Sequence, residues 1–443
     1  MVGWTLAGLV EDEIEMVRLL WCDLVGLTRG IAHRIEKVQQ SPWMPLPSVE
    51  MALGVMIDAP KLDCGIPTAE QVYLHLDEST LRMLPYASGH ASGYGDILDA
   101  NGEPWLFCPR GFLKRQIATL ASMGLQIKAA FESEFVLFDL EDGEMVPTDQ
   151  HGYASIQALN MKHEVLEAIR AALDAQNIQV TALLAESASG QHEIVVQHVD
   201  VLAAADQQLV VRETVHAVAR QLGMIASFLP VLFEKEGGNG SHVHLSLWRN
   251  GKNVTGDAQQ ADGLSEETAW FMAGILSHLE ALLSVTTPTT NSFRRIQPGH
   301  WSGAYLGWGF DNKEMPLRVP KQPGASPPSN IEIKACDATS NPYLALGVLL
   351  AAGIDGLKNH LVLRQPVPHF PAAMGASEQE SLGLTQLPDT LEKSLDCFEA
   401  DQVLSAALGI ELFNAYTGIK RDEVKLFSGM SLDDEIQCLL ERH

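Results

Sequence analysis

Four short, otherwise apolar segments of this chain carry ionisable side chains at alternating positions or around a glycine turn. Successive side chains of a β-strand point to opposite faces of a sheet, so acids two residues apart, such as Glu132 and Glu134, project from one face. The signature recurs at Glu186 and Glu193 around Gly190, at His242, His244 and Ser246, and at Glu332 and Lys334. Each segment alone is equally typical of a half-exposed strand facing water. Four of them in a chain with 19% charged residues favour one shared polar site.

Five glutamates and a histidine on facing strands cannot all be charged without counter-ions, because like charges in a cleft repel one another. A pair of divalent cations would balance them, and an oxygen-rich set with one imidazole suits Mg²⁺ or Mn²⁺ better than zinc or iron. Two such cations in a cleft suggest phosphoryl transfer from a nucleotide. The sequence has no P-loop and no G-x-G-x-x-G after a strand, so the nucleotide would need a different cradle. Basic residues downstream fit that chemistry, namely Arg294, Arg295, Lys313 and Arg318.

The charge balance excludes several kinds of partner. The chain of 443 residues has 56 acidic and 30 basic side chains, a net charge of −26, which argues against nucleic acid and anionic membrane surfaces. Its six cysteines are scattered without a C-x-x-C pair, as is typical of free thiols in the cytoplasm. The acidic N-terminal region is unlike a signal peptide, and the apolar stretch 343–354 is too short to span a bilayer. We therefore expect a cytoplasmic protein of two or three domains.

Hydrophobic periodicity predicts an α+β chain. We expect helices over 11–20, 109–124, 160–176, 203–222, 268–283 and 343–357, and strands over 20–24, 127–138, 180–184, 193–197 and 242–248. Proline-rich 320–328 and the Pro/Gly/Ser-rich stretch 365–383 are predicted loops. The pattern divides into a smaller, turn-rich N-terminal unit that ends near Trp105 and a large second unit.

Nine short motifs follow one another along nearly the whole chain. They are DLVGLTRG at 23–30, DESTLR at 77–82, CPRGFLK at 108–114, ESEF at 132–135, GQHE at 190–193, GSHVHLS at 240–246, NSFRR at 291–295, NPYL at 341–344 and AGIDG at 352–356. Each motif alone is weak evidence. Together and in this order they resemble the glutamine synthetase family.

The resemblance implies a glutamine synthetase fold, with an N-terminal β-grasp domain over 1–105 and a catalytic domain over 106–443. The catalytic domain would be built on an antiparallel sheet flanked by helices. The resemblance also implies a ring-shaped homo-oligomer, commonly a dodecamer, with active sites between neighbouring subunits. Its substrates would be ATP, L-glutamate and an amine, with two or three Mg²⁺ or Mn²⁺ ions in each site.

Site residues carry over position by position from the resemblance. Glu134, Glu186 and Glu193 match the ligands of one metal, and Glu132, His242 and Glu332 match those of the other. His244 and Ser246 match nucleotide-contacting positions. Lys313 and Arg318 stand where the family has arginines that serve the phosphates, and Arg295 matches an arginine that holds the glutamate carboxylate. Lys334 occupies the position of a second such arginine, and Gly237-Gly238 replaces an Asn-Gly pair of the glutamate site.

The family chemistry has two steps. The γ-carboxylate of glutamate attacks the γ-phosphate of ATP and gives γ-glutamyl phosphate and ADP. An amine then displaces phosphate from the activated acyl group. Metals and cationic side chains stabilise the charge on the transferring group, while closure excludes the water that would hydrolyse the acyl phosphate.

The departures from the family pattern lie on the amine side. Where true glutamine synthetases have a glutamate that binds ammonium and accepts its proton, this chain has Trp301 in PGHWSG at 298–303. An indole has no basic site. The aspartate of the ammonium site has only Asp58 as a candidate, and His300 is a weak alternative as proton acceptor. Because an aryl amine arrives neutral at pH 7, an indole-lined site favours an aromatic or bulky amine such as aniline.

We therefore predict an ATP-dependent γ-glutamyl-amide synthetase that uses an organic amine. Alternatives stay open at this point. Trp301 could make a cation–π contact with an alkylammonium such as a polyamine, could simply pack the loop, or the enzyme could be a true glutamine synthetase using ammonium. A non-catalytic structural or regulatory family member is an outside alternative, disfavoured because all six metal-ligand positions are present.

Overall fold

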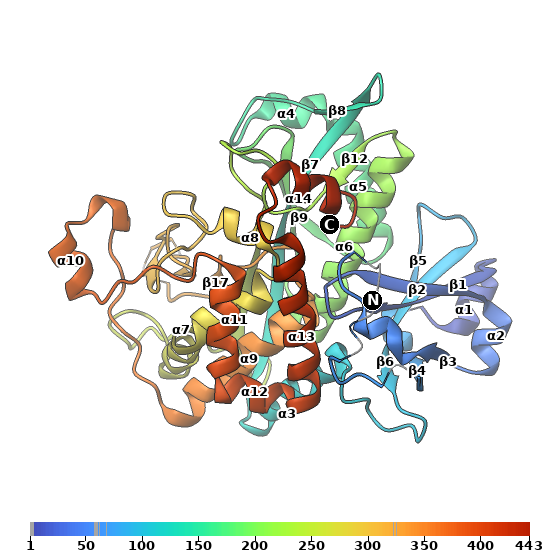
Figure 1. The fold of residues 1–443 in the computed structure, drawn as a ribbon, viewed down its shortest axis with the longest axis horizontal. Coiled ribbons are helices and arrows are strands. Elements are labelled where there is room, and N and C mark those ends of the chain that lie inside the picture. Colours follow the sequence, from blue (N-terminus) through green and yellow to red (C-terminus); the bar gives the residue numbers. More distant parts are fainter. Residues whose placement is uncertain (1–3, 57–60, 62, 68, 322, 325) are drawn as a thin grey trace.

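The computed structural model describes residues 4–56, 61, 63–67, 69–321, 323–324 and 326–443, which fold around two sheets (Figure 1). The N-terminal sheet has the order β2-β1-β6-β4-β3, with β5 paired to β6. Its β1–β6 pair is parallel and its other pairs are antiparallel. Its strands are β1 (Met16–Cys22), β2 (Thr28–Arg34), β3 (Trp43–Pro47), β4 (Gln71–Leu76), β5 (Arg82–Met83) and β6 (His90–Leu98). Two short helices, α1 (Leu6–Glu11) and α2 (Ile35–Gln40), accompany it.

The helix predicted over 11–20 is wrong. Helix α1 ends at Glu11, and Glu13 has a φ of 60°, a left-handed conformation that cannot continue a helix. The residues that follow alternate between buried and partly exposed as β1. The apolar side chains therefore follow the period of a strand, and the predicted strand at 20–24 is the second half of β1 and the turn after it.

The second sheet is built around one long strand, β7 (Gln126–Glu141). Its order is β15-β16-β17-β13-β7-β10-β9, and β8, β11 and β12 also pair with β7 while β14 pairs with β13. All these pairs are antiparallel except β15–β16. The other strands are β8 (Glu144–Pro147), β9 (Val180–Ala185), β10 (Gln191–Val196), β11 (Val199–Asp200), β12 (Ile225–Ser227), β13 (Ser241–Arg249), β14 (Lys252–Asn253), β15 (Trp308–Phe310), β16 (Leu317–Val319) and β17 (Ile331–Ile333).

Most helices lie in the second unit, where α3, α5, α6, α7 and α9 confirm the helices predicted from the sequence and the others were not predicted. They are α3 (Pro109–Ser122), α4 (Ile156–Met161), α5 (His163–Ala175), α6 (Val201–Gln221), α7 (Glu266–Thr286), α8 (Thr290–Arg295), α9 (Pro342–Asn359), α10 (Ala376–Ser381), α11 (Leu391–Ala400), α12 (Gln402–Leu408), α13 (Ile410–Phe427) and α14 (Leu432–Leu439). The predicted loop 365–383 is partly wrong, because it contains α10 and a turn of 3₁₀ helix (Pro371–Ala373). Figure 1 shows α10 far from the N-terminal strands, beyond the central helices.

Helices α7 and α9 form an apolar pair that needs glycine at its contact. A Cβ on Gly274 would overlap the carbonyl oxygen of Ala352, and one on Gly356 would overlap that of Trp270. Glycine at both positions therefore lets the two backbones approach closely. By length and composition, α7 is the one helix of the described residues that could cross a membrane, but 72% of its apolar window is buried inside the protein, as in a core helix.

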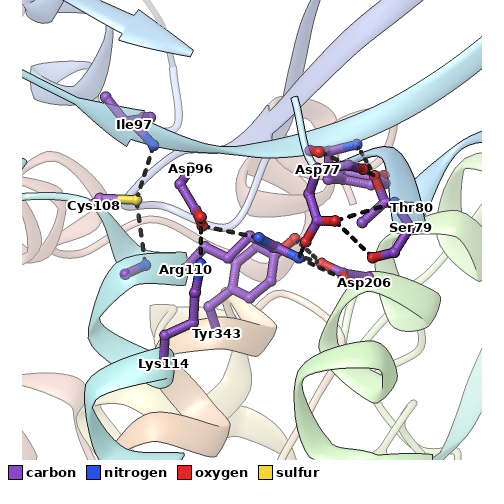
Figure 2. Close-up of polar contacts among 12 residues, drawn as sticks. Asp77, Ser79, Thr80, Asp96, Ile97, Cys108, Arg110, Lys114, Asp206 and Tyr343 are labelled. Atoms are coloured by element: carbon purple, nitrogen blue, oxygen red, sulfur yellow. Dashed lines mark hydrogen bonds and ion pairs between the residues drawn. The ribbon is translucent and has the colours of Figure 1, made fainter. Parts of the chain in front are cut away.

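A buried ionic network joins the N-terminal sheet to the helices (Figure 2). Arg110, at the start of α3, has a side chain only 4% exposed and lies between three aspartates. It donates to Asp96 on β6 and to Asp77 beyond β4, both at 2.8 Å, and to Asp206 on α6 at 3.1 Å. The Tyr343 hydroxyl of α9 donates to Asp206 at 2.6 Å. The DESTLR and CPRGFLK motifs thus supply this contact between the two units.

Candidate active site

The polar side chains predicted to share one site meet on neighbouring strands of the large sheet. Strand register places Glu132 of β7 opposite His242 of β13, and Glu134 of β7 opposite Glu193 of β10. On the next strands, Glu332 of β17 faces both His244 of β13 and Arg318 of β16. Antiparallel partners in register present their side chains to the same face, so the alternating signature assembles one site.

One end of the site is a cluster of three carboxylates. Glu134, Glu186 and Glu193 each bring an oxygen atom within 4.8 Å of the others. Burial raises the pKa of Glu193 to about 9 and that of Glu186 to about 8, and in both cases the charge of Glu134 adds to the effect. This cluster therefore carries more negative charge than its surroundings compensate. Three convergent carboxylates, two of which (Glu186 and Glu193) have no cationic side chain as ion-pair partner among the described residues, suit a hard divalent cation.

The other end combines glutamates with imidazoles. Nδ1 of His242 lies 3.5 Å from carboxylate oxygens of both Glu132 and Glu332, and Nε2 of His244 lies 3.0 Å from Glu132. Burial would raise the pKa values of both acids, but the hydrogen bonds from His242 and His244 lower that of Glu132. The nearby charge of Lys334 lowers that of Glu332 to about 2. Glu132, His244 and Glu332 also converge within 4.8 Å, so both imidazoles adjoin this end.

Three cationic side chains close the site beside these residues. Arg295 and Lys334 approach Nε2 of His242 at 3.2 and 3.3 Å, and since both can only donate, this nitrogen accepts. Burial, together with the charge of Lys334, lowers the pKa of His242, as expected for a neutral imidazole. Arg318 hydrogen-bonds Glu332. The predicted phosphate and carboxylate ligands thus lie within reach of the acidic cluster.

A cavity of about 440 Å³ opens beside the imidazole end of the site. Its lining includes Lys128, His198, His244, Ser246 and Asn330. His244 contacts Asn330 at 2.8 Å through Nδ1, and Ser246 accepts a hydrogen bond from the indole of Trp248 at 2.8 Å. Both predicted nucleotide residues, His244 and Ser246, therefore line one cavity next to the acids, large enough for part of a nucleotide.

A second, smaller cavity of about 180 Å³ contains the acidic cluster and Trp301. Trp301 has a φ of 53°, and its backbone N–H donates to Glu314 at 3.0 Å while that of Gly299 donates to the same carboxylate at 3.1 Å. These bonds fix the loop, yet the indole stays 46% exposed. Lys313 places its ammonium 4.8 Å from the indole centre and 5.6 Å from the ring of Tyr153.

Comparison with known proteins settles which family this site belongs to. The model of the glutamine synthetase catalytic domain matches residues 106–438. The chain belongs to the glutamine synthetase family. It is 32% identical over 459 residues to type-1 glutamine synthetase 1 of Dictyostelium discoideum, covering 97% of this chain and 90% of that one. Glutamine synthetase of Thermotoga maritima is 31% identical, covering 98% and 99%.

Solved structures agree with this glutamine synthetase assignment. A novel glutamine synthase homolog superposes with a TM-score of 0.85 at 30% identity, covering 97% of this chain and 99% of that one. A complex of GmaS with ADP gives 0.84 at 25% identity, with coverage of 98% and 99%. The fold class is thus confirmed as α+β with the glutamine synthetase fold. Family members are ATP-dependent ligases that form C–N bonds with Mg²⁺ or Mn²⁺, and the acidic clusters found here fit those cations.

Within this glutamine synthetase fold, sequence reasoning missed Tyr153. It follows Gly152 in a turn after β8 and shares the small cavity with Leu184, His300 and Trp301. No periodic pattern marks the residue, because it lies in an irregular segment that sequence alone does not bring near 298–303. Gly238, predicted for the substrate, lines the same cavity. Asp58 lies outside the described residues, so its role stays a prediction.

Proposed function

We propose that this protein is an ATP-dependent ligase that joins the γ-carboxylate of L-glutamate to an organic amine rather than to ammonium. The observation that carries the proposal is Trp301. At the position of the family's ammonium-binding glutamate the chain places an exposed indole, with Tyr153 and Lys313 beside it. These groups offer apolar surface and a cation where ammonium chemistry needs a base.

The proposed roles are those that the resemblance to the family assigns, and the closeness of these residues in the site supports them. Glu134, Glu186 and Glu193 would hold one divalent cation, and Glu132, His242 and Glu332 the other, with His244 and Ser246 beside the nucleotide. The cations, when bound, neutralise charge on the phosphates. Lys313 and Arg318 would stabilise the transferring phosphoryl group, while Arg295, Lys334 and Gly238 would orient L-glutamate so that its γ-carboxylate faces the γ-phosphorus.

In the first step, a γ-carboxylate oxygen forms a bond to phosphorus and the bond to ADP breaks. In the second, the amine nitrogen attacks the acyl carbon, phosphate leaves with the oxygen, and the nitrogen loses a proton. An aryl amine enters this step neutral, whereas an alkylammonium must first be deprotonated. Because Trp301 cannot accept a proton, the site favours aromatic or bulky amines such as aniline.

A γ-glutamyl-alkylamide or γ-glutamylpolyamine synthetase is the second candidate. The ammonium of Lys313 already lies over the rings of Trp301 and Tyr153, so the same rings would attract an alkylammonium.

The test measures phosphate release and product mass with MgATP, L-glutamate and one amine at a time: ammonium, isopropylamine, ethanolamine, putrescine or aniline. We expect turnover with aniline or another bulky amine and little with ammonium. In Trp301→Glu we expect activity with ammonium to rise and activity with aniline to fall at least tenfold. Trp301→Phe is the matched control, since it keeps an aromatic wall and should retain the wild-type preference.

Each opposing result has a defined meaning. Efficient glutamine formation from ammonium by the wild type would contradict the proposal and indicate a nitrogen-assimilating enzyme. Preference for putrescine would select the second candidate. Nucleotide binding without turnover of any amine would favour a non-catalytic role.

Three further predictions complete the proposal. We expect a ring homo-oligomer, a dodecamer by analogy with the family, whose active sites lie between subunits, and light scattering gives the mass that checks it. We expect the N-terminal domain to cover 1–105 and the catalytic domain 106–443, with the boundary checked by limited proteolysis. A cytoplasmic location stays a prediction, testable by cell fractionation.

A further inference from the structure

Gln191, from the GQHE motif, has a buried amide directly against the acidic cluster. It is the first residue of β10 and is only 2% exposed. A buried primary amide must satisfy its hydrogen bonds within the protein. Its partners therefore show what this side chain holds in place.

The amide connects three parts of the site. Its Oε1 accepts from the backbone N–H of Ala188 at 2.8 Å, in the turn that carries Glu186. Its Nε2 donates to Oε2 of Glu134 at 3.1 Å, to Oδ1 of Asn239 at 3.0 Å and to the carbonyl of Gly238 at 3.2 Å. Two N–H groups thus face three acceptors, which belong to a carboxylate of the cluster and to the loop 237–239.

The backbone supports the same connections. The backbone carbonyl of Gln191 accepts from the N–H of Glu186 at 2.8 Å. Oε2 of Glu134, which accepts from Gln191, also accepts from the backbone N–H of Gly240 at 2.7 Å. The position of the Glu134 carboxylate therefore depends on Gln191 on one side and on the residue after the loop 237–239 on the other.

The loop 237–239 packs closely against its neighbours on both sides. A Cβ on Gly238 would overlap the carbonyl oxygen of Pro230 and would approach Cγ of Arg295 to 3.2 Å. Asn239 is held from the other side, where its Nδ2 donates to the carbonyl of Leu229 at 2.9 Å. A displacement of the Gln191 amide is therefore transmitted to the loop beside Arg295.

From these contacts we infer that Gln191 is a positioning residue that couples cation binding at Glu134, Glu186 and Glu193 to L-glutamate binding at Gly238 and Arg295. A cation held by Glu134 fixes the carboxylate, and Gln191 passes that constraint to the glutamate loop. The inference rests on the glutamate-binding part of the proposed function and is independent of the amine.

The test measures this coupling as a ratio of two dissociation constants. L-Glutamate binding is measured by calorimetry at limiting and at saturating Mn²⁺, and Mn²⁺ binding is followed separately by electron paramagnetic resonance. By linkage, the ratio of the two glutamate constants is the coupling between the sites. We expect tighter glutamate binding with Mn²⁺ in the wild type, and a ratio at least fivefold closer to one in Gln191→Met, which keeps the volume but not the hydrogen bonds.

Gln208 on α6 provides the matched control. It is an equally buried amide, 3% exposed, that accepts from Ser133 at 2.8 Å and donates to Ser241 at 3.1 Å. Ser133 lies on β7 and Ser241 on β13, where they alternate with the site residues, so Gln208 joins these two strands from the face opposite the site. Gln208→Met should lower the melting temperature but keep the wild-type ratio.

A second variant keeps the inference testable if Gln191→Met does not fold. Gln191→Glu retains an acceptor for Ala188 but loses both donors, so it should also lose the coupling. A wild-type ratio in a folded Gln191 variant, no coupling in the wild type, or an equal loss in Gln208→Met would overturn the inference. Since no amine enters the measurement, a failed amine preference would leave this result unaffected.

Discussion

Two groups of three buried or partly buried carboxylates in the described part of the chain differ in their counter-charge. Asp77, Asp96 and Asp206 surround the guanidinium of Arg110, with hydrogen bonds of 2.8 to 3.1 Å. In Glu134, Glu186 and Glu193, one oxygen atom of each carboxylate lies within 4.8 Å of the others. Within the part of the chain that the structure describes, neither Glu186 nor Glu193 forms an ion pair with a cationic side chain.

The difference separates a structural network from a binding site. We call the first group balanced, because Arg110 and Lys114 of the chain itself supply its counter-charge. This group joins two units of the fold. An unbalanced group holds raised pKa values, about 8 for Glu186 and about 9 for Glu193, that an added cation would relieve. Two groups of three acids therefore serve different purposes in this protein. The presence or absence of a cationic side chain within hydrogen-bonding distance distinguishes the structural group from the binding group.

The largest effect on stability should come from the balanced network. Arg110→Met leaves the buried Asp206 and the partly buried Asp77 without their cation, so we expect the free energy of unfolding to fall by about 3–5 kcal/mol. Urea unfolding measures it. Lys114→Met is the control, because Lys114 pairs with Asp96 from a half-exposed position and should cost no more than about 1 kcal/mol. Equal effects of the two substitutions would contradict the comparison.

The unbalanced cluster should show the opposite behaviour. In Glu193→Gln we expect kcat to fall about 10²–10³-fold, as when one group that stabilises transition-state charge is removed. The metal-free variant should be as stable as the wild type or more so, because it buries one carboxylate fewer. Steady-state rates measure the fall in kcat, and the melting temperature in EDTA measures the stability of the metal-free variant. A variant that unfolds easily but keeps its activity would place Glu193 in a structural role.

Adding a cation should stabilise the protein through the unbalanced group and not through the balanced one. At a concentration of Mn²⁺ one hundred times its dissociation constant, one site should stabilise the protein by about 2.7 kcal/mol. The gain should disappear in Glu193→Gln and persist in Lys114→Met. Thermal unfolding with Mn²⁺ and with EDTA provides the measurement, and an equal gain in both variants would argue against a cation at this cluster.

His278 represents an intermediate case, because its imidazole is a counter-charge for two aspartates only while it is protonated. It lies between Asp401, at 2.6 Å, and Asp355, at 3.3 Å. Burial would lower the pKa of His278, but the hydrogen bonds and charges of the two aspartates outweigh it and raise the pKa. The stabilisation is thus complete below the unfolded value of about 6.5 and is lost as pH rises through the folded value.

The smallest effect is therefore a pH dependence. The difference in unfolding free energy between the wild type and His278→Gln should shrink as the pH is raised from 6 to 9. Urea unfolding at several pH values measures it, with Lys114→Met as a variant whose difference from wild type should not follow this pattern. A difference that grows with pH would give the opposite sign and contradict the assignment.

Much of the site could be predicted because it obeys a local rule. Alternating acids and histidines predict one face of a strand, and the registers Glu132–His242 and Glu134–Glu193 bring these faces together. The long apolar helices could be predicted from the sequence equally well. The helix predicted over 11–20 failed because Glu13 adopts a left-handed conformation, which a periodic pattern does not reveal.

What the sequence could not supply depends on contacts between distant segments. Arg110 contacts Asp77 and Asp96 only after the two units pack, and Asp206 only after α3 packs near α6 (Figure 2). Tyr153 lies in a turn without any motif, and the ammonium of Lys313 lies over both its ring and that of Trp301. Such contacts follow from tertiary packing, and no local spacing encodes them.

The order of the strands along the sequence also determines when the acidic site can form during synthesis of the chain. β7 carries Glu132, but its partner strand β13 and the neighbouring β17 are encoded much later. About 200 residues separate Glu132 from Glu332, which at roughly 5–20 residues per second takes a ribosome about 10–40 s. During this interval β7 gains β8, β10, β12 and β13 as partners, whereas Glu332 of β17 is added only at its end. The acidic site is therefore incomplete until about three-quarters of the chain has been synthesised, and cations can bind the full set of acids only after that point.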